Sequence, residues 1–422
     1  MSDYTAELLT LSAILNEKKT YKESLFKIFQ EQNLSKNSKH IVSINVAGVL
    51  RHYFCLSYEC LELLDIEKNS NEHILSLIAL YVLRYQKKVS KEIVYSSFKS
   101  AWMNVRSLGD LDKIFEIIYN ASLNPFAIDE NVKKSPVFYN SLVLEMPDFL
   151  LKRFNEIYSS RVSLSIASSL HKKDVYFFGG INEDKEELSH NFKSVSFDDF
   201  TLYYTKKNMT LDEIKKLHIY PFSYLNSLAF SHLDLPVIAP KILTLNPLNC
   251  FDLLYLHNKI SSCVDYKLDC SSLDDISYRN CEDTIRFFNL KNVNTIKSDL
   301  NYVKTSYETN AYDYVILHGN DLKIGLARSQ IGVLPSLSEH DIKRSYQRQC
   351  DELEESSYFV KDGGYLIFIN NTLINEESYD VLSYFLKAHK DFYVIKEQIV
   401  LPQILDNDGG FYTILRKRGK DD

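Results

Sequence analysis

The sequence predicts a protein of the α/β class, with a helical region, a small mixed region and a doubly wound sheet in chain order. Three observations predict this class. Apolar residues recur at helical spacing from Ala6 to about Tyr119, and chain breakers gather between Asn124 and Pro147. After Pro240, apolar runs of strand length alternate with amphipathic stretches, which is typical of a parallel sheet covered by helices.

The first region, residues 1–140, is expected to be an all-helical domain. Its apolar residues keep the three- and four-residue spacing of one helix face, at Leu8, Leu11, Ile14 and Leu15, then at Leu25, Ile28 and Phe29, and again over 74–85. Asn124-Pro125, Pro136 and Pro147 then interrupt the pattern. These breakers place the first domain boundary.

The second region, residues 141–238, is expected to be a small α+β domain. A short helix over 149–158 precedes candidate strands at 175–178, 195–197 and 201–204, and residues 211–217 have a helical pattern between polar loops.

The third region, residues 239–422, is expected to hold a seven-stranded sheet. The candidate strands are 241–245, 263–269, 293–297, 312–318, 365–370, 393–400 and 411–415. Helical stretches between the strands indicate a mostly parallel sheet that is buried on both faces. The last two strands are close in sequence, which favours a hairpin at the end of the chain.

Composition limits the classes of function. The chain has 422 residues, of which 45% are hydrophobic and 25% charged, as in compact globular proteins of two or three domains. The net charge of −7 excludes a uniformly basic nucleic-acid clamp, so any RNA contact must come from local patches.

The seven cysteines form no C-x-x-C pair, which predicts reduced thiols and no metal site. The N-terminus does not resemble a signal peptide, and no run of about 18 apolar residues occurs. We therefore expect a cytoplasmic monomer without a membrane partner.

One C-terminal segment carries a family resemblance. Residues 361–378, Lys-Asp-Gly-Gly-Tyr-Leu-Ile-Phe-Ile-Asn-Asn-Thr-Leu-Ile-Asn-Glu-Glu-Ser, resemble the K-x-G-G-x-L-V-Y-x-T-C-S-x-x-x-x-E-N segment of the RNA cytosine-C5 methyltransferases. Asp408-Gly-Gly-Phe-Tyr412 is similar to the family's D-G-F-F-Y, and Leu150-Leu-Lys-Arg153 to the W-L-L-K-R that begins its small RNA-contacting subdomain. The resemblance implies a Rossmann-like methyltransferase domain.

A second resemblance lies in the helical region. Gly48-Val-Leu-Arg51 is similar to the G-V-L-R signature of NusB-like domains, and residues 75–85 to the helix that follows it there. Together, the two resemblances indicate the bacterial 16S rRNA branch of the family, which carries a NusB-like N-terminal domain. They imply RNA, and rRNA in particular, as the partner.

The reaction of this family needs an activated cysteine, because a thiolate must add to carbon 6 of cytosine before carbon 5 can accept a methyl group. The residue that matches the nucleophile is Asn371, whose carboxamide cannot form the adduct. The family's second cysteine matches Asp321, and the aspartate that stabilises the base matches His318. We therefore expect no catalytic residues here; among the cysteines, Cys250 alone falls on a strand-end loop, on the cofactor side.

Cofactor binding is expected to be lost as well. The family's D-x-C-A-A-P-G-G-K-T loop matches residues 244–252, in which the glycine pair and the lysine are absent and Leu248 and Phe251 would fill the ligand's space. Asp269 and Asp299 match the family's ribose and adenine contacts, although helix capping or turn formation is the preferred explanation of both. No cofactor is expected, and S-adenosylmethionine would be the cofactor if the protein were active.

Basic residues in four places could contact RNA. They are Lys152, Arg153, Lys172 and Lys173 on the small domain, Arg328, the group Lys343, Arg344 and Arg348, and the tail Arg416-Lys-Arg418. Tyr203, Tyr204 and Tyr346 could stack on unpaired bases. A solvated surface is the alternative for each cluster, and Arg51 could serve a structural role in the helical domain.

The preferred hypothesis is a catalytically inactive RNA-binding homologue of the 16S rRNA cytosine-C5 methyltransferase that acts in ribosome assembly or as an RNA scaffold. One alternative is an active S-adenosylmethionine-dependent rRNA methyltransferase with an altered mechanism. Another is a NusB-like module that binds protein and RNA in transcription complexes. A scaffold that binds only proteins, such as ribosome-assembly proteins, is the third.

Overall fold

The computed structural model describes residues 4–86, 88–105, 110–124, 126, 128–180, 185–197, 200–233, 239–247, 251–263, 265–298 and 303–419. The chain divides into two compact units, each described by itself. Unit 1 comprises Met1–His171 and Ala327–Ser338, and unit 2 comprises Lys172–Leu326 and Glu339–Asp422.

The regular elements described in unit 1 are all helices. They are α1 (Thr5–Leu15), α2 (Tyr21–Glu31), α3 (Lys36–Arg51), α4 (Tyr53–Leu63), α5 (Asn71–Tyr85), α6 (Lys91–Asn104), α7 (Leu111–Ser122), α8 (Glu130–Lys133), α9 (Pro136–Val143), α10 (Asp148–Ile157), α11 (Ser160–Ser169) and α18 (Val333–Ser336). This confirms the expected helical region, although the proposed division at residue 140 stays a prediction.

Local sequence explains where several of these helices begin. The side chains of Ser35 and Ser70 accept hydrogen bonds from backbone N–H groups three residues ahead, and Thr20 forms a reciprocal capping box with Glu23. Behind the caps, the apolar faces meet in one core in which α5 contributes seven fully or nearly fully buried apolar residues between Ile74 and Val82.

A buried ion pair links the helices of unit 1. Arg84 on α5 donates from its two terminal nitrogens to the carboxylate of Glu59 on α4, at 2.5 and 2.7 Å, and also to the carbonyl of Ala121 at 2.8 Å. The two side chains are only 9% and 11% exposed. The pair is therefore shielded from water.

Unit 2 begins with a four-stranded antiparallel sheet, which we call the small sheet. Its strands are β1 (Tyr176–Gly180), β2 (Lys193–Ser196), β3 (Thr201–Thr205) and β4 (Ile219–Pro221), in the order β2-β3-β1-β4. The accompanying helices are α12 (Lys185–Asn191), α13 (Leu211–Lys216) and α14 (Tyr224–Phe230). The expected mixture of strands and helices is found here, whereas the domain bounds 141–238 stay a prediction; β4 is a strand that the sequence did not predict.

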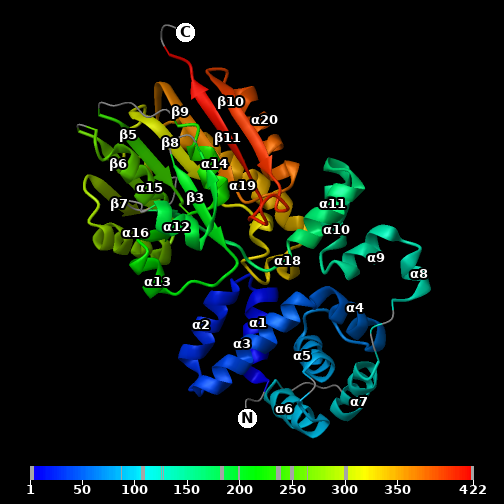
Figure 1. The fold of residues 1–422 in the computed structure, drawn as a ribbon. Coiled ribbons are helices and arrows are strands. Elements are labelled where there is room, and N and C mark those ends of the chain that lie inside the picture. Colours follow the sequence, from blue (N-terminus) through cyan, green and yellow to red (C-terminus); the bar gives the residue numbers. More distant parts are fainter. Residues whose placement is uncertain are drawn as a thin grey trace. The chain divides into compact units, whose positions relative to one another are not determined.

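The larger sheet of unit 2 has the order β10-β11-β9-β8-β5-β6-β7 and can be followed in Figure 1. Its strands are β5 (Lys241–Leu245), β6 (Lys267–Ser272), β7 (Val293–Lys297), β8 (Tyr312–His318), β9 (Val360–Asn370), β10 (Phe392–Val400) and β11 (Gly410–Lys417). All neighbours are parallel except β11, which runs antiparallel to β9 and β10. The seven-stranded sheet and its terminal hairpin are confirmed.

Alternate residues of the large sheet pack against opposite layers of helices. Ile242 and Ile316 join an apolar cluster with α14 and α15 (Phe251–Ile260), and the cluster also includes Cys281 of α16 (Asp275–Phe288). Leu243 and Val315 face the other way, toward α19 (Glu339–Ser357) and α20 (Tyr379–Ala388). The connections before α19 and α20 contain the short 3-10 helices η1 (Ile324–Leu326) and η2 (Asn375–Glu377).

We expect Arg84→Met to destabilise unit 1 by about 3 kcal/mol, because the Glu59 carboxylate would stay buried without its partner. Urea unfolding followed by far-UV circular dichroism measures this loss. The matched control is Lys91→Met, which breaks a more exposed pair with Glu116 and should cost less than about 1 kcal/mol. Equal losses for the two variants would contradict the assignment.

Candidate functional site

The candidate site lies at the carboxyl end of β9, where the sequence predicted the lost nucleophile. Asn370 and Asn371 follow the last apolar residues of the strand, and both side chains are buried. The Asn370 amide donates to the side-chain oxygen of Gln349 on α19, and also to the Glu377 carbonyl at 2.6 Å. The strand end is therefore fixed to the helix layer beside it.

The Glu377 carboxylate connects three segments around this strand end. It accepts hydrogen bonds from the Leu322 amide at 2.9 Å, from Gln349 Nε2 at 2.8 Å and from Thr372 Oγ1 at 2.9 Å. The Ser345 hydroxyl donates to it as well. Burial raises the pKa of Glu377. Glu377 is not among the residues predicted for the site, although the glutamate of the quoted family segment marks its position.

Asp321 and Asn371, the positions of the two family cysteines, are joined directly. One Asp321 carboxylate oxygen accepts the backbone N–H of Asn371, and the other accepts the N–H of Lys323 at 2.9 Å. Burial, with the nearby charge of Glu377, raises the pKa of Asp321 to about 8. A hydrogen bond thus connects the two positions, and neither residue has a thiol that could act as the nucleophile.

Close backbone approach completes this site. The Gly325 N–H donates to the Asn371 carbonyl at 2.7 Å, and the Gly325 carbonyl accepts the Gly409 N–H at 3.2 Å. A Cβ atom at Gly325 would lie 1.9 Å from the Gly409 carbonyl oxygen. Glycine is therefore required where these three segments meet.

His318 belongs to the opposite layer of the sheet. It is 1% exposed, and its Nε2 lies 3.1 Å from a carboxylate oxygen of Asp252 in the first turn of α15. Asn226 of α14 donates to the same carboxylate at 2.8 and 2.9 Å. The structure therefore brings Asp321 and Asn371 together but directs His318 to the α14–α15 side. The contact between His318 Nε2 and the Asp252 carboxylate does not have the geometry of a hydrogen bond.

The expected cofactor positions have mixed outcomes. Leu248, Cys250 and Asp299 lie outside the described residues. Phe251 packs against the α14–α15 cluster, with its ring centroid 6.4 Å from that of Tyr220. Near the carboxyl end of β5, the buried side-chain oxygen and nitrogen of Asn246 and the hydroxyl of Thr244 have no hydrogen-bond partner among the described residues.

The expectation that Asp269 ends the second strand is wrong. β6 runs from Lys267 to Ser272, so Asp269 lies in mid-strand and is fully buried. Tyr312 donates its hydroxyl to Asp269 at 2.5 Å, and Lys267 forms an ion pair with the same carboxylate at 2.6 Å. These contacts give Asp269 a structural role between β6 and β8.

Two predicted RNA contacts are buried. Arg328 is 6% exposed and donates through Nε and Nη2 to the Ser169 carbonyl, at 3.1 and 2.6 Å, within unit 1. Tyr203 is 1% exposed in the core of the small sheet. Neither side chain presents a surface to RNA, so both expectations are corrected.

Five other basic candidates are exposed or partly exposed. Lys343, Arg344 and Arg348 are exposed on α19; Arg344 pairs with Asp341, and Arg348 donates to the Asn320 carbonyl. In unit 1, Lys152 is exposed and pairs with Asp148 at 2.9 Å, while Arg153 is partly buried.

The described residues lack two further kinds of feature, a cluster of metal ligands and a membrane-spanning helix. These residues contain no group of three or more His, Cys, Asp or Glu side chains placed to hold a metal ion. None of the described helices is long and apolar enough to cross a membrane. Among the described cysteines, five are free thiols and Cys281 is disulfide-bonded, so the expectation of reduced thiols is wrong at Cys281.

The strand order, together with the likeness to solved structures, shows a Rossmann-like methyltransferase fold. The structure is similar to that of a protein designated PH0851 over 99% of both chains, with a TM-score of 0.75 and 14% identity. A methyltransferase homologue from Pyrococcus horikoshii matches over 67% of this chain and 99% of its own, with a TM-score of 0.55 and 15% identity.

A third solved structure, NSun6 from Pyrococcus horikoshii with SFG, matches over 64% of this chain and 98% of its own, with a TM-score of 0.55 and 12% identity. No family model matches the sequence, and no curated protein matches it. At these identities the likeness establishes the fold.

The raised pKa of Asp321 makes stability depend on pH. The unfolded chain loses this proton near an ordinary aspartate pKa of about 4, whereas the folded protein keeps it until about pH 8. The stabilisation is therefore complete below about pH 4 and is lost as pH rises through 8. We expect wild-type protein to lose roughly 4 kcal/mol between about pH 5 and pH 8 in urea unfolding, at about 1.4 kcal/mol per pH unit.

Asp321→Asn is the control for this prediction, because it removes the titrating group while keeping its size. The variant should be less stable at low pH, since one backbone N–H loses its acceptor, but its stability should change less over the same pH range. A pH profile parallel to that of the wild type would show that another group is responsible.

Proposed function

We propose that this protein is a catalytically inactive, RNA-binding homologue of the 16S rRNA cytosine-C5 methyltransferases that acts in ribosome assembly or as an RNA scaffold. The observation that carries the proposal is the Asp321–Asn371 hydrogen bond. The bond joins the two residues that stand where the resemblance places cysteines. Neither the carboxylate of Asp321 nor the carboxamide of Asn371 can replace a thiolate in the addition to carbon 6.

Two free cysteines of unit 2, Cys350 and Cys270, are poor substitutes for the missing nucleophile. Cys350 is closest in sequence to this site, next to Gln349 on α19, but it is 3% exposed within the α19–α20 apolar cluster. Burial raises the pKa of its thiol, which disfavours the thiolate. Cys270 is fully buried in β6, and burial raises its pKa to about 12.

The basic face of α19 supports the RNA-binding part of the proposal. The exposed side of α19 carries Lys343, Arg344 and Arg348. The buried side of the same helix supplies Ser345 and Gln349, which donate to Glu377. Arginine and lysine at this position can bind phosphates electrostatically. Lys152 and Arg153 on α10 form a second candidate contact.

One observation favours the alternative of an active or ligand-binding protein. Polar atoms of Thr244 and Asn246, and Nδ1 of His318, have no hydrogen-bond partner among the described residues. They lie at the carboxyl ends of β5 and β8, the edge where doubly wound sheets bind ligands. S-adenosylmethionine would be the ligand of an active enzyme. NusB-like interactions and a purely protein-binding scaffold stay as predictions from the sequence.

We expect no 5-methylcytosine to disappear from rRNA when the protein is deleted, because the chain lacks the required thiols. Bisulfite sequencing of rRNA from deletion and parent strains measures this, and isothermal calorimetry with S-adenosylmethionine measures cofactor binding. A methylated cytosine lost on deletion, together with tight cofactor binding, would refute the inactive assignment.

We expect the double substitution Lys343→Ala and Arg344→Ala to weaken rRNA binding and to reduce the slope of log affinity against log salt by about 2. Fluorescence anisotropy with labelled rRNA fragments measures both quantities. Lys27→Ala, at an exposed lysine of α2 that pairs with Glu31, is the control and should change neither. Unchanged binding in the double variant would exclude the α19 face as the RNA contact.

A further inference from the structure

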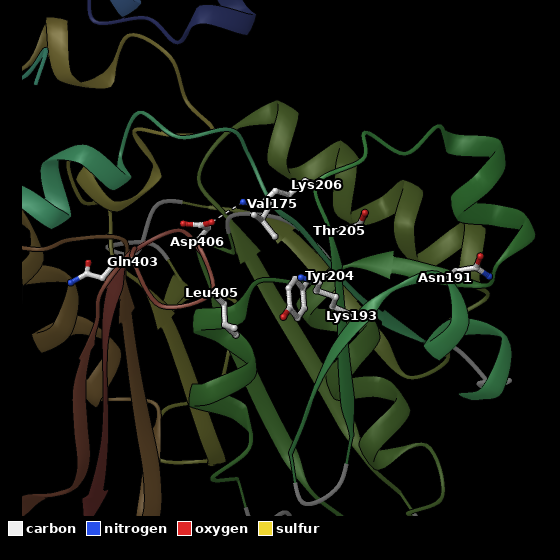
Figure 2. A pocket seen from close by; sticks show the side chains of 9 residues that line it. All are labelled: Val175, Asn191, Lys193, Tyr204, Thr205, Lys206, Gln403, Leu405 and Asp406. Carbon is white, nitrogen blue, oxygen red and sulfur yellow. Dashed lines mark hydrogen bonds and ion pairs between the residues drawn. The ribbon is translucent and has the colours of Figure 1, made fainter.

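A pocket of about 580 Å³ lies within unit 2, between the small sheet and the loop that follows β10 (Figure 2). Val175, Lys193 and Tyr204 line it from the small sheet and its approach, and Leu405 and Asp406 line it from the loop. Its volume falls within the range of about 300–1,000 Å³ found for small-molecule sites. Neither the Asp321–Asn371 site nor the basic face of α19 includes any of these residues.

Lysines give this pocket an excess of positive charge. Asp406 holds two of them, with Lys172 Nζ at 2.9 Å from one carboxylate oxygen and Lys206 Nζ at 2.9 Å from the other. Lys193 is a third, exposed lysine in the lining. The lining itself contains two lysines and one carboxylate, and the two lysines that Asp406 holds are 48% and 60% exposed and accessible to an anion from solution.

The Asp406 carboxylate occupies its position through an unusual backbone. Leu405 and Asp406 both have left-handed conformations, with φ of 55° and 53°, which residues with side chains adopt only when their surroundings favour it. The two lysines hold the pKa of Asp406 at about 2, so the group stays anionic. It is placed where an external phosphate would bind the same ammonium groups.

Tyr204 supplies an aromatic surface in the same pocket. Its ring is partly buried and is backed by Phe177, with 5.5 Å between centroids and 30° between planes. In Figure 2 the Tyr204 ring lies between Leu405 and Lys193. A ring supported in this way loses little freedom when a flat group stacks on it.

We propose that this pocket binds one nucleotide of a single-stranded RNA, with the base against Tyr204 and the phosphate at Lys172 and Lys206 in place of Asp406. The proposal rests on the RNA-binding function proposed above and adds a separate site to it. Aromatic stacking and lysine–phosphate contacts together are the usual means of binding unpaired nucleotides. Asp406 acts as an internal competitor that keeps the lysines in position until a phosphate displaces it.

Fluorescence anisotropy of the full-length protein with a labelled single-stranded hexaribonucleotide tests the site. Tyr204→Leu keeps an apolar side chain beside Phe177 and should weaken binding about tenfold through lost stacking. Lys206→Gln should weaken binding and lower the salt slope by about 1. Lys207→Gln is the matched control, because the neighbouring lysine pairs with Glu213 outside the lining and should have no effect.

Asp406→Asn gives a result that misfolding could not produce. Removal of the competing carboxylate should tighten binding several-fold, whereas a damaged fold would weaken it. The pocket assignment is overturned if the protein binds the oligonucleotide but Tyr204→Leu and Lys206→Gln behave like Lys207→Gln, or if Asp406→Asn weakens binding. In that case the α19 face can still account for RNA binding. Absence of binding by wild-type protein to both this oligonucleotide and rRNA fragments would refute the proposed function and the pocket together.

Discussion

The architecture of the candidate site depends on one buried carboxylate, that of Glu377. A charge in this environment is tolerated only when donors surround it, and Glu377 receives four of them, from the loop after β8, from α19 and from the turn after β9. The same contacts determine where the Asp321 loop can lie. These hydrogen bonds around Glu377 hold the carboxyl end of β9 in place, and none of them needs the thiols that the resemblance would place at positions 321 and 371.

The sequence predicted the large sheet well where a strand is an uninterrupted apolar run. Strands β5, β7 and β8 have the predicted bounds. β6 was placed too early because its second half, Cys270-Ser-Ser272, is small and polar yet fully buried, so neither hydrophobicity nor alternation reveals it. β9 begins before the predicted residue because Gly363-Gly364 resembles a turn but continues the strand.

The candidate site was only partly visible in the sequence. The family resemblance identified positions 321 and 371, and in the structure a hydrogen bond joins them. Sequence spacing could not show that Arg328 points into unit 1, because side-chain direction depends on tertiary contacts. Asp406 was likewise invisible as a partner of Lys172 and Lys206, since 234 and 200 residues separate them along the chain.

The hydrogen bonds of Asp321 have an evolutionary consequence under the proposed descent from an enzyme. A return to cysteine at this position would remove the acceptor for two backbone N–H groups at once, in a buried place where water cannot replace it. This single reversion would thus reduce stability without restoring activity. A second cysteine would still be needed at position 371. The Asp321 carboxylate therefore makes reversal of the loss unfavourable, because a cysteine at position 321 alone would lower stability without restoring activity.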